Sequence, residues 1–183
     1  RFPLKDKSGE TLYSPDVIKF ARSQGYFDGK DEEFDFSKAY GVTDFGALRG
    51  CDARVWAYFN LFTPGMDKYL PWIDRAEGDP MPLWVKPEKP LSAADMKRAM
   101  RDHFEGTPYD MTNDIGAGPY KVPYRWRPMT FKVDSVEYTH ERAIATQQTG
   151  FSFVAQLRND VAPELRGLLW FGTDDANTCV YLP

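Results

Sequence analysis

The chain has 183 residues, of which 42% are hydrophobic and 27% charged, a balance typical of a soluble globular protein. A net charge of -4 argues against nucleic acid as a partner, because binding a phosphate backbone requires a basic surface. No apolar run approaches the roughly 20 residues of a membrane-spanning helix, which argues against a membrane as a partner. The length predicts a single domain over residues 1–183.

The first predicted element is a short helix near the N-terminus. The sequence SPD at residues 14–16 combines a hydroxyl N-cap, a proline at the first helical position and an acid. Gly25 predicts the end of this helix. The acidic and aromatic segment 26–43 then places Phe34 and Phe36 on either side of an aspartate. This alternation leaves two structures open, a short strand or a loop anchored by its aromatic side chains.

Residues 44–62, DFGALRGCDARVWAYFNLF, form the strongest predicted helix. Arg54 lies at the edge of its apolar stripe, so its guanidinium is expected to reach inward, whereas Arg49 is expected to face water. The stripe itself is defined by apolar residues that recur at helical spacing. They are Leu48, Cys51, Val55, Tyr58, Phe59 and Phe62.

Residues 63–90 contain six prolines and are expected to be irregular, with one strand around residues 83–85. The segment is not expected to be a flexible linker, because Trp72, Ile73 and Trp84 call for burial.

A further helix is predicted to begin after Ser92, because Asp95 stands at the capping-box position. It is expected to end at residues 106–108, a Gly-Thr-Pro sequence. Its expected apolar face comprises Met96, Ala99, Met100, His103 and Phe104.

The last third of the chain changes to the period of strands. Residues 151–157, FSFVAQL, and 166–172, RGLLWFG, predict two strands, and residues 178–183 predict a third. The apolar run LLWF predicts burial on both faces of its strand. Residues 139–149 fit a helix and a strand equally well. The residues alone therefore leave two fold classes open, α+β and layered αβ.

Reactive side chains gather where the helix after Ser92 ends. His103, Glu105, Asp110 and Asp114 could bind a metal or share a proton, but their spacing matches no metal motif. His103 also lies on the apolar helix face, where a hydrogen-bonded core histidine is the commoner finding. The other interpretation is a structural corner, in which Asp110 and Thr112 bond to nearby backbone.

Other candidate sites are weak. Cys51 and Cys179 form no disulfide framework and are expected to be buried thiols, and neither has the sequence context of a nucleophile. The glycines of residues 116–119, GAGP, are too few for a phosphate loop. Five scattered tryptophans leave one alternative function open, a non-enzymatic aromatic-lined module that binds a ligand or carbohydrate.

Four segments in chain order carry a more specific signal: ARVWAYFNLF, VKPEKPLSAADMKRAMRDHFEGTPYDMT, the stretch from GAGP to PYRW, and GLLWFGTDDANTCVYLP. Together they resemble the dipeptidase family of cysteine-type N-terminal-nucleophile (Ntn) hydrolases. The most specific of them is RDHFEGTPYDMT.

The resemblance implies an αββα sandwich of mostly antiparallel sheets with flanking helices. It also implies hydrolysis of dipeptides or related small amides, without cofactor or metal. The nucleophile is the thiolate of a cysteine at residue one of the mature enzyme, and its own α-amino group is the base. An amine suits this task because its ordinary pKa, about 8, lies near neutral pH.

This sequence departs from the family pattern because Arg1 is not a cysteine and the segments that carry the nucleophile and the oxyanion asparagine are absent. The chain is therefore expected to be a central fragment, inactive alone, with the catalytic cysteine upstream. Its incomplete sheet is expected to leave an open edge, which predicts self-association or a companion chain.

The resemblance also assigns candidate site residues. Arg54, which opens the sequence RVW, matches an active-site arginine of related cysteine Ntn hydrolases, with an ordinary surface arginine as the alternative. Tyr109 and Asp110 are candidate substrate contacts, with the structural corner as their alternative. A dipeptide is the expected substrate.

Overall fold

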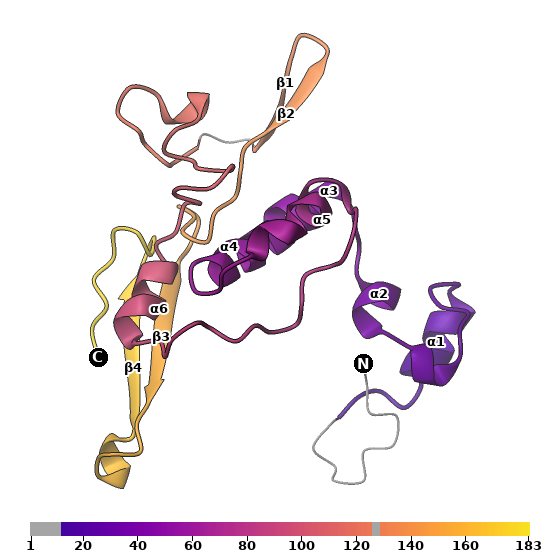
Figure 1. The fold of residues 1–183 in the computed structure, drawn as a ribbon, viewed down its shortest axis with the longest axis horizontal. Helices are drawn as coiled ribbons and strands as arrows, with labels where there is room; N and C mark the ends of the chain where they lie inside the picture. Colours follow the sequence, from indigo (N-terminus) through magenta and orange to yellow (C-terminus); the bar gives the residue numbers. More distant parts are fainter. Residues whose placement is uncertain (1–11, 126–128) are drawn as a thin grey trace. The chain divides into compact units, whose positions relative to one another are not determined.

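The computed structural model describes residues 12–125 and 129–183. The chain divides into two compact units, Arg1–Asp44 and Phe45–Pro183 (Figure 1). Each unit has its own cluster of buried hydrophobic residues. The single domain expected over residues 1–183 remains a prediction, since two compact units can also belong to one domain.

The first unit is built from α1 (Val17–Ser23), a 3-10 turn η1 (Asp31–Glu33) and α2 (Phe36–Tyr40). Its buried residues are Val17, Ala21 and Phe34. The predicted helix is present, but it starts at Val17 after a turn over residues 15–16, and it ends before Gly25, whose φ is +72°.

The segment around Phe34 is not the short strand that the alternation left open. Phe34 is 2% exposed, and the side chain of Asp35 caps α2 by accepting from the backbone N–H groups of Ser37 and Lys38. The aspartate between the two phenylalanines is therefore a helix cap, and the aromatic side chain anchors the segment.

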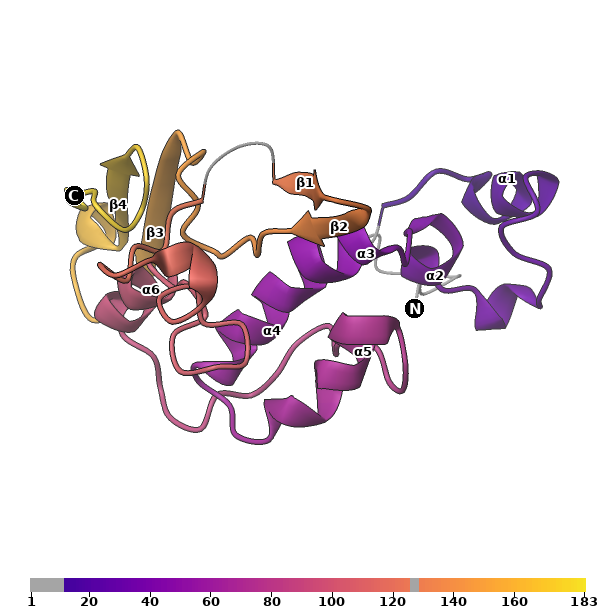
Figure 2. The ribbon, with the colours of Figure 1, turned by 90° about the horizontal axis from the view of Figure 1, so that it is seen from above.

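The second unit begins with one continuous helical stretch. It consists of α3 (Phe45–Ala47), the π-helical segment η2 (Leu48–Asp52) and α4 (Ala53–Asn60). Then follow η3 (Met66–Tyr69), which packs with α4, and α5 (Leu70–Arg75), which packs with the π-helical segment (Figure 2). The predicted helix over 44–62 is therefore present, with a π-helical segment inside it.

The predicted apolar stripe of this helix is wrong in its orientation. The buried residues are Leu48, Ala53, Trp56 and Ala57, whereas Cys51 is exposed and Val55 is 40% exposed. The π-helical segment supplies one reason, because i→i+5 bonding turns less per residue and brings Leu48 onto the face of Ala53 and Trp56. The two alanines supply another, because their small side chains let neighbouring segments approach closely.

The expectation for residues 83–85 is also wrong. No strand forms there, and Leu83 and Trp84 are 93% and 74% exposed. Pro80, Pro82 and Pro87 lack the N–H groups that a strand would pair. Ile73, by contrast, is fully buried as expected.

The capping box of the next helix, α6 (Ala93–Ala99), is confirmed. Ser92 Oγ accepts from the backbone N–H of Asp95 at 3.2 Å, and Asp95 Oδ2 accepts from the backbone N–H of Ser92 at 2.9 Å. The helix is shorter than predicted, because the chain leaves helical geometry after residue 100 and Phe104 has a φ of +64°.

The strands form two antiparallel pairs. The pair β3 (Phe151–Leu157) and β4 (Gly167–Thr173) confirms two predicted strands, whereas the hairpin β1 (Thr130–Val133) and β2 (Val136–Thr139) was not predicted. The predicted third strand is reduced to one bridge between Phe171 and Leu182. Residues 140–149 are turns and bends, neither helix nor strand.

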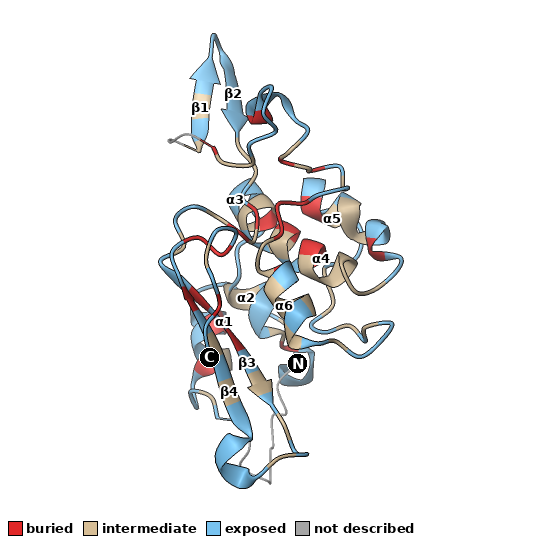
Figure 3. Ribbon diagram, turned by 90° about the vertical axis from the view of Figure 1, so that its left-hand side faces the viewer, coloured by how far each residue is buried: buried red, intermediate tan, exposed pale blue. Residues whose placement is uncertain are grey.

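One face of the β3–β4 pair is covered and the other is open. Helix α6 packs against β3, on the side of Ser152 and Val154, which are buried. The opposite face carries exposed apolar side chains, so the predicted burial of LLWF on both faces is wrong. They are Phe151, Phe153, Leu157, Leu169 and Phe171. Figure 3 shows exposed residues along β4.

The fold is thus a mixture of short helices and two-stranded antiparallel sheets, and the finer αββα sandwich remains a prediction. The core of the second unit lies between α4, α5 and the turns after α6, with Trp56, Ile73, Phe104 and Tyr109 at its centre. Among the helices in the described ranges, none has the length and hydropathy needed to cross a membrane.

Candidate functional site

The turns after α6, residues 100–112, are held by the side chain of Asp110. Its Oδ1 accepts from the N–H and hydroxyl of Thr112 at 2.8 and 2.6 Å. Its Oδ2 accepts from the N–H of Gly106 at 2.9 Å and from Asn113 at 2.8 Å. Burial alone would raise the pKa of Asp110, but these bonds hold its pKa below the ordinary value. The carboxylate therefore organises the corner that was predicted as the alternative to a reactive site.

Tyr109 lies 9% exposed beside this corner, with its ring against Trp56 and Phe104. Its hydroxyl donates to Asp74 Oδ1 at 2.7 Å. Burial is the larger cause and this bond to a carboxylate the smaller one, and they raise the pKa of Tyr109 to about 12. Tyr109 therefore keeps its proton at any physiological pH and acts as a donor.

Arg49 joins the same group of side chains. Its guanidinium lies 3.9 Å from the centre of the Tyr109 ring and pairs with Asp74 at 2.6 Å and with Glu141. Only 12% of the Arg49 side chain is exposed. Burial raises the pKa of Glu141, and Arg49 opposes that shift. The expectation that Arg49 faces water is thus wrong, because two carboxylates distant in sequence draw it inward.

A second titratable group lies where α6 gives way to the turns. His103 is 2% exposed, as expected for a core histidine, and its Nδ1 lies 3.2 Å from Glu105 Oε1. Its Nε2 is buried and has no hydrogen-bond partner among the described residues. Asp102 is 6% exposed and accepts from the N–H of Phe104 at 3.0 Å. Burial raises the pKa of Asp102 to about 6.

Asp102 predicts a pH dependence of stability. Between about pH 4 and pH 6 the folded state keeps a proton that the unfolded state releases, so the free energy of unfolding falls as pH rises. The fall is expected to be about 3 kcal/mol, from roughly two pKa units. Asp102→Asn should flatten this slope in urea titrations, because an amide does not titrate in this range. The amide oxygen can still accept from the N–H of Phe104, so this hydrogen bond is kept.

Asp110→Asn is the matched control, because the pKa of Asp110 is shifted downward. Removing this carboxylate should leave the fall in the free energy of unfolding above pH 4 in place. An unchanged slope in Asp102→Asn would contradict the assignment.

Arg125, which sequence reasoning did not single out, is a buried cation of the second unit, 4% exposed. It pairs with Asp114 and donates to the carbonyl of Met111 at 2.6 Å. A Cβ on Gly116 would approach Arg125 Nε to 2.7 Å. Gly116, the first glycine of GAGP, is therefore needed for this close packing. That glycine was the only signal in the sequence for a buried Arg125.

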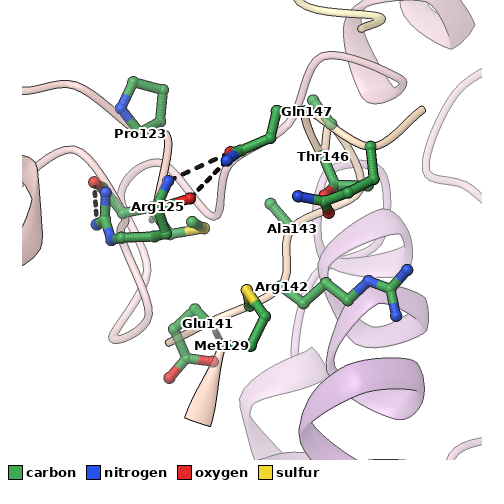
Figure 4. A pocket seen from close by; sticks show the side chains of 11 residues that line it. Pro123, Arg125, Met129, Glu141, Arg142, Ala143, Thr146 and Gln147 are labelled. Carbon is green, nitrogen blue, oxygen red and sulfur yellow. Dashed lines mark hydrogen bonds between the residues drawn. The ribbon is translucent and has the colours of Figure 1, made fainter. Parts of the chain in front are cut away.

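A cavity of about 10 Å³ lies beside Arg125 and Gln147. The side-chain amide of Gln147 bonds to the backbone N–H and carbonyl of Arg125 (Figure 4). This volume suffices for about one water molecule. The cavity cannot hold a substrate.

A larger hollow of about 520 Å³ opens on the face of α4 that was predicted to be buried. Arg54 stands in its wall, and its Nε donates to the carbonyl of Gly50 at 2.7 Å. Among the described residues no carboxylate pairs with Arg54. The other lining residues are Cys51, Val55, Tyr58, Phe59, Met100 and Ile144.

The two cysteines differ from the expectation of buried thiols. Cys51 is exposed at this hollow and Cys179 is partly exposed, and both are free. The described parts of the chain contain no group of three or more side chains that could hold a metal ion. The structure thus separates the predicted site residues: Arg54 lies at the open hollow, whereas Tyr109 and Asp110 lie in the corner.

The hydrolase class follows from comparison with known proteins. The chain belongs to Peptidase family C69, whose sequence model matches residues 1–183, which confirms the resemblance to cysteine-type dipeptidases. A probable dipeptidase from Salmonella dublin is 32% identical over 99 residues, 54% of this chain and 22% of that protein.

Two relatives from lactobacilli match more of the chain. A probable dipeptidase from Latilactobacillus sakei is 22% identical over 172 residues, 94% of this chain and 31% of that protein. Dipeptidase A from Lactobacillus helveticus is 24% identical over 154 residues, 80% of this chain and 27% of that protein. The chain thus spans between about a fifth and a third of the length of these relatives. No solved structure matches it.

Proposed function

We propose that these residues are part of a cysteine-nucleophile dipeptidase that hydrolyses dipeptides or related small amides. The match of Peptidase family C69 over the whole chain carries this proposal. The names of the relatives, dipeptidase and probable dipeptidase, support dipeptides as the substrate. The fold of the parent enzyme is proposed to be the αββα sandwich, and residues 1–183 to form part of one domain.

The nucleophile is proposed to be a cysteine outside residues 1–183. Neither cysteine present has the surroundings of an activated thiol. Cys51 lies within a π-helical segment, and Cys179 Sγ contacts the carbonyl of Ala176 at 3.7 Å. No described histidine stands next to either, since His103 pairs with Glu105 and His140 lies against the ring of Phe131.

Arg54 is proposed as the active-site arginine of the parent enzyme. Its position at an open hollow, with no carboxylate partner among the described residues, supports this role, whereas Arg49 is held by two carboxylates. The roles of Tyr109 and Asp110 as substrate contacts remain predictions, and their hydrogen bonds favour the structural alternative. Self-association through the open side of the β3–β4 pair likewise remains a prediction.

Release of free amino acids from a panel of dipeptides tests the proposal. The purified 183-residue chain is expected to show no turnover above buffer, and Cys51→Ser and Cys179→Ser are expected to leave that result unchanged. The natural gene product that contains these residues is expected to hydrolyse dipeptides and to lose this activity when its N-terminal cysteine is replaced. Turnover by the chain alone that Cys51→Ser abolishes would contradict the proposed nucleophile.

The alternative is the non-enzymatic binding module. Trp84, 74% exposed, would be its natural contact. Oligosaccharide binding that Trp84→Ala abolishes, with no dipeptide turnover by the natural gene product, would favour that module instead.

A further inference from the structure

We propose that the hollow on α4 binds the C-terminal residue of a short peptide. In this arrangement Arg54 pairs with the terminal carboxylate and the apolar wall accepts a bulky side chain. The inference rests on the proposed function, because it assigns one half of a dipeptide to a place on this chain.

The size and lining of the hollow fit such a ligand. Its volume of about 520 Å³ falls within the roughly 300–1,000 Å³ of small-molecule sites. Val55, Phe59 and Ile144 supply apolar contact, and Met100 supplies a flexible side chain that adapts to different shapes. The hollow lies within the second unit and is lined by α4, the residue after α6 and the loop before β3.

The charge of the hollow selects the carboxyl end of the peptide. Arg54 is the only charged residue among the described lining residues. Its Nε donates to the Gly50 carbonyl, which orients the guanidinium, and within the described ranges the two terminal nitrogens have no protein acceptor and can bind a ligand. A carboxylate matches this fork with two parallel hydrogen bonds. An α-ammonium group would find no carboxylate among the described lining residues, so the hollow favours the carboxyl end of the peptide.

Two other arginines of the same unit show why Arg54 is distinct. Arg49 is held by Asp74 and Glu141, and Arg125 by Asp114 and three backbone carbonyl groups. The charge of each is therefore paired with at least one carboxylate of the fold itself. Arg54 has the same side chain, but among the described residues it has only a neutral partner.

Cys51 supplies a direct reporter, because its exposed thiol lies in the lining of the hollow. The experiment uses the full chain with Cys179→Ser, so that iodoacetamide modifies one thiol, and measures how ligands slow that reaction. The probes are the dipeptide Ala-Phe, its C-terminal amide, Ala-Ala, and octanoate as a carboxylate that is not a peptide.

Ala-Phe is expected to protect Cys51 at millimolar concentration. The amide and Ala-Ala are each expected to protect on the order of tenfold less well, because the amide lacks the carboxylate and Ala-Ala lacks the large side chain. Arg54→Gln is expected to make Ala-Phe and its amide equal, and Arg54→Lys to retain part of the difference. Arg75→Gln is the matched control, because Arg75 is an exposed arginine of α5 that pairs with Glu77, and it should behave as the parent chain.

Equal protection by Ala-Phe and its amide in the parent chain would overturn the proposal. So would protection by octanoate without protection by Ala-Phe, or no protection by any probe while circular dichroism shows a folded chain. Because the readout is binding, its failure is distinct from failure of the proposed function. Absence of protection beside dipeptide turnover by the natural gene product would refute the hollow alone, whereas protection without such turnover would refute the dipeptidase.

Discussion

Replacing Arg49 with methionine is expected to lower the free energy of unfolding by about 2 to 4 kcal/mol. The substitution keeps the apolar stem of the side chain but leaves Asp74 and Glu141 without their cation. Removing one partner of a fully buried ion pair costs roughly 3 to 5 kcal/mol, because an uncompensated charge stays in the protein. The expected value is lower here, because Asp74 is 38% exposed and water screens it. Urea titration at pH 7 measures the loss.

A second substitution tests the cause of this loss. Glu141→Gln, introduced together with Arg49→Met, should recover part of the stability, because burial makes the Glu141 carboxylate the more costly of the two unpaired acids. Arg75→Met is the control for loss of an arginine, because its pair with Glu77 is 61% exposed on both sides and should matter little. If Arg49→Met and Arg75→Met unfold at the same urea concentration, the buried network has no energetic role.

Replacing Trp56 with alanine is expected to cost about 3 to 5 kcal/mol, the range for large-to-small changes at fully buried aromatic residues. Trp56 is 0% exposed and lies at the centre of the core of the second unit, in edge contact with Tyr109. Its Nε1 donates to the carbonyl of Met66 at 2.9 Å, which ties α4 to the start of η3. Both the packing and the hydrogen bond are lost in the alanine variant.

Trp56→Phe separates these two contributions. Phenylalanine keeps much of the ring but leaves the Met66 carbonyl without its donor, at an expected cost of about 1 to 3 kcal/mol. The midpoint of urea unfolding, with circular dichroism as the readout, measures both variants. Because Trp56 and Arg54 lie on different faces of α4, Trp56→Phe should leave ligand protection of Cys51 unchanged. A loss in Trp56→Ala no greater than in Trp56→Phe would show that the core collapses around the smaller side chain.

The elements that the sequence predicted well are those that neighbours along the chain determine. The capping box of α6 needs only Ser92 and Asp95, three residues apart, and it forms as predicted. The strands β3 and β4 follow from the residue types within each segment. The corner at Asp110 likewise uses partners within four residues, so its structural interpretation was available from sequence alone.

The elements that failed depend on contacts between distant segments. The stripe of α4 was read from a regular helical period, and the π-helical segment breaks that period before Ala53. Trp84 and the LLWF run were expected to be buried because of their apolar side chains, but within the described chain Trp84 stays exposed and only one face of the LLWF strand is covered. The hairpin of β1 and β2 is an exception: it was not predicted, although TFKV and VEYT alternate apolar and polar residues around a two-residue turn.

Sequence by itself determined the local helix caps and the strand pair, because these depend on residues close together in the chain, and it identified the family from the matching residues of four segments. Only the tertiary structure decided which arginine is buried and which is open to a ligand. Arg49 and Arg54 lie five positions apart on one helix, but the carboxylates that hold Arg49 come from positions 25 and 92 residues away. Coulomb attraction acts between groups that the fold brings together, so the electrostatic role of each arginine was set by its partners in space.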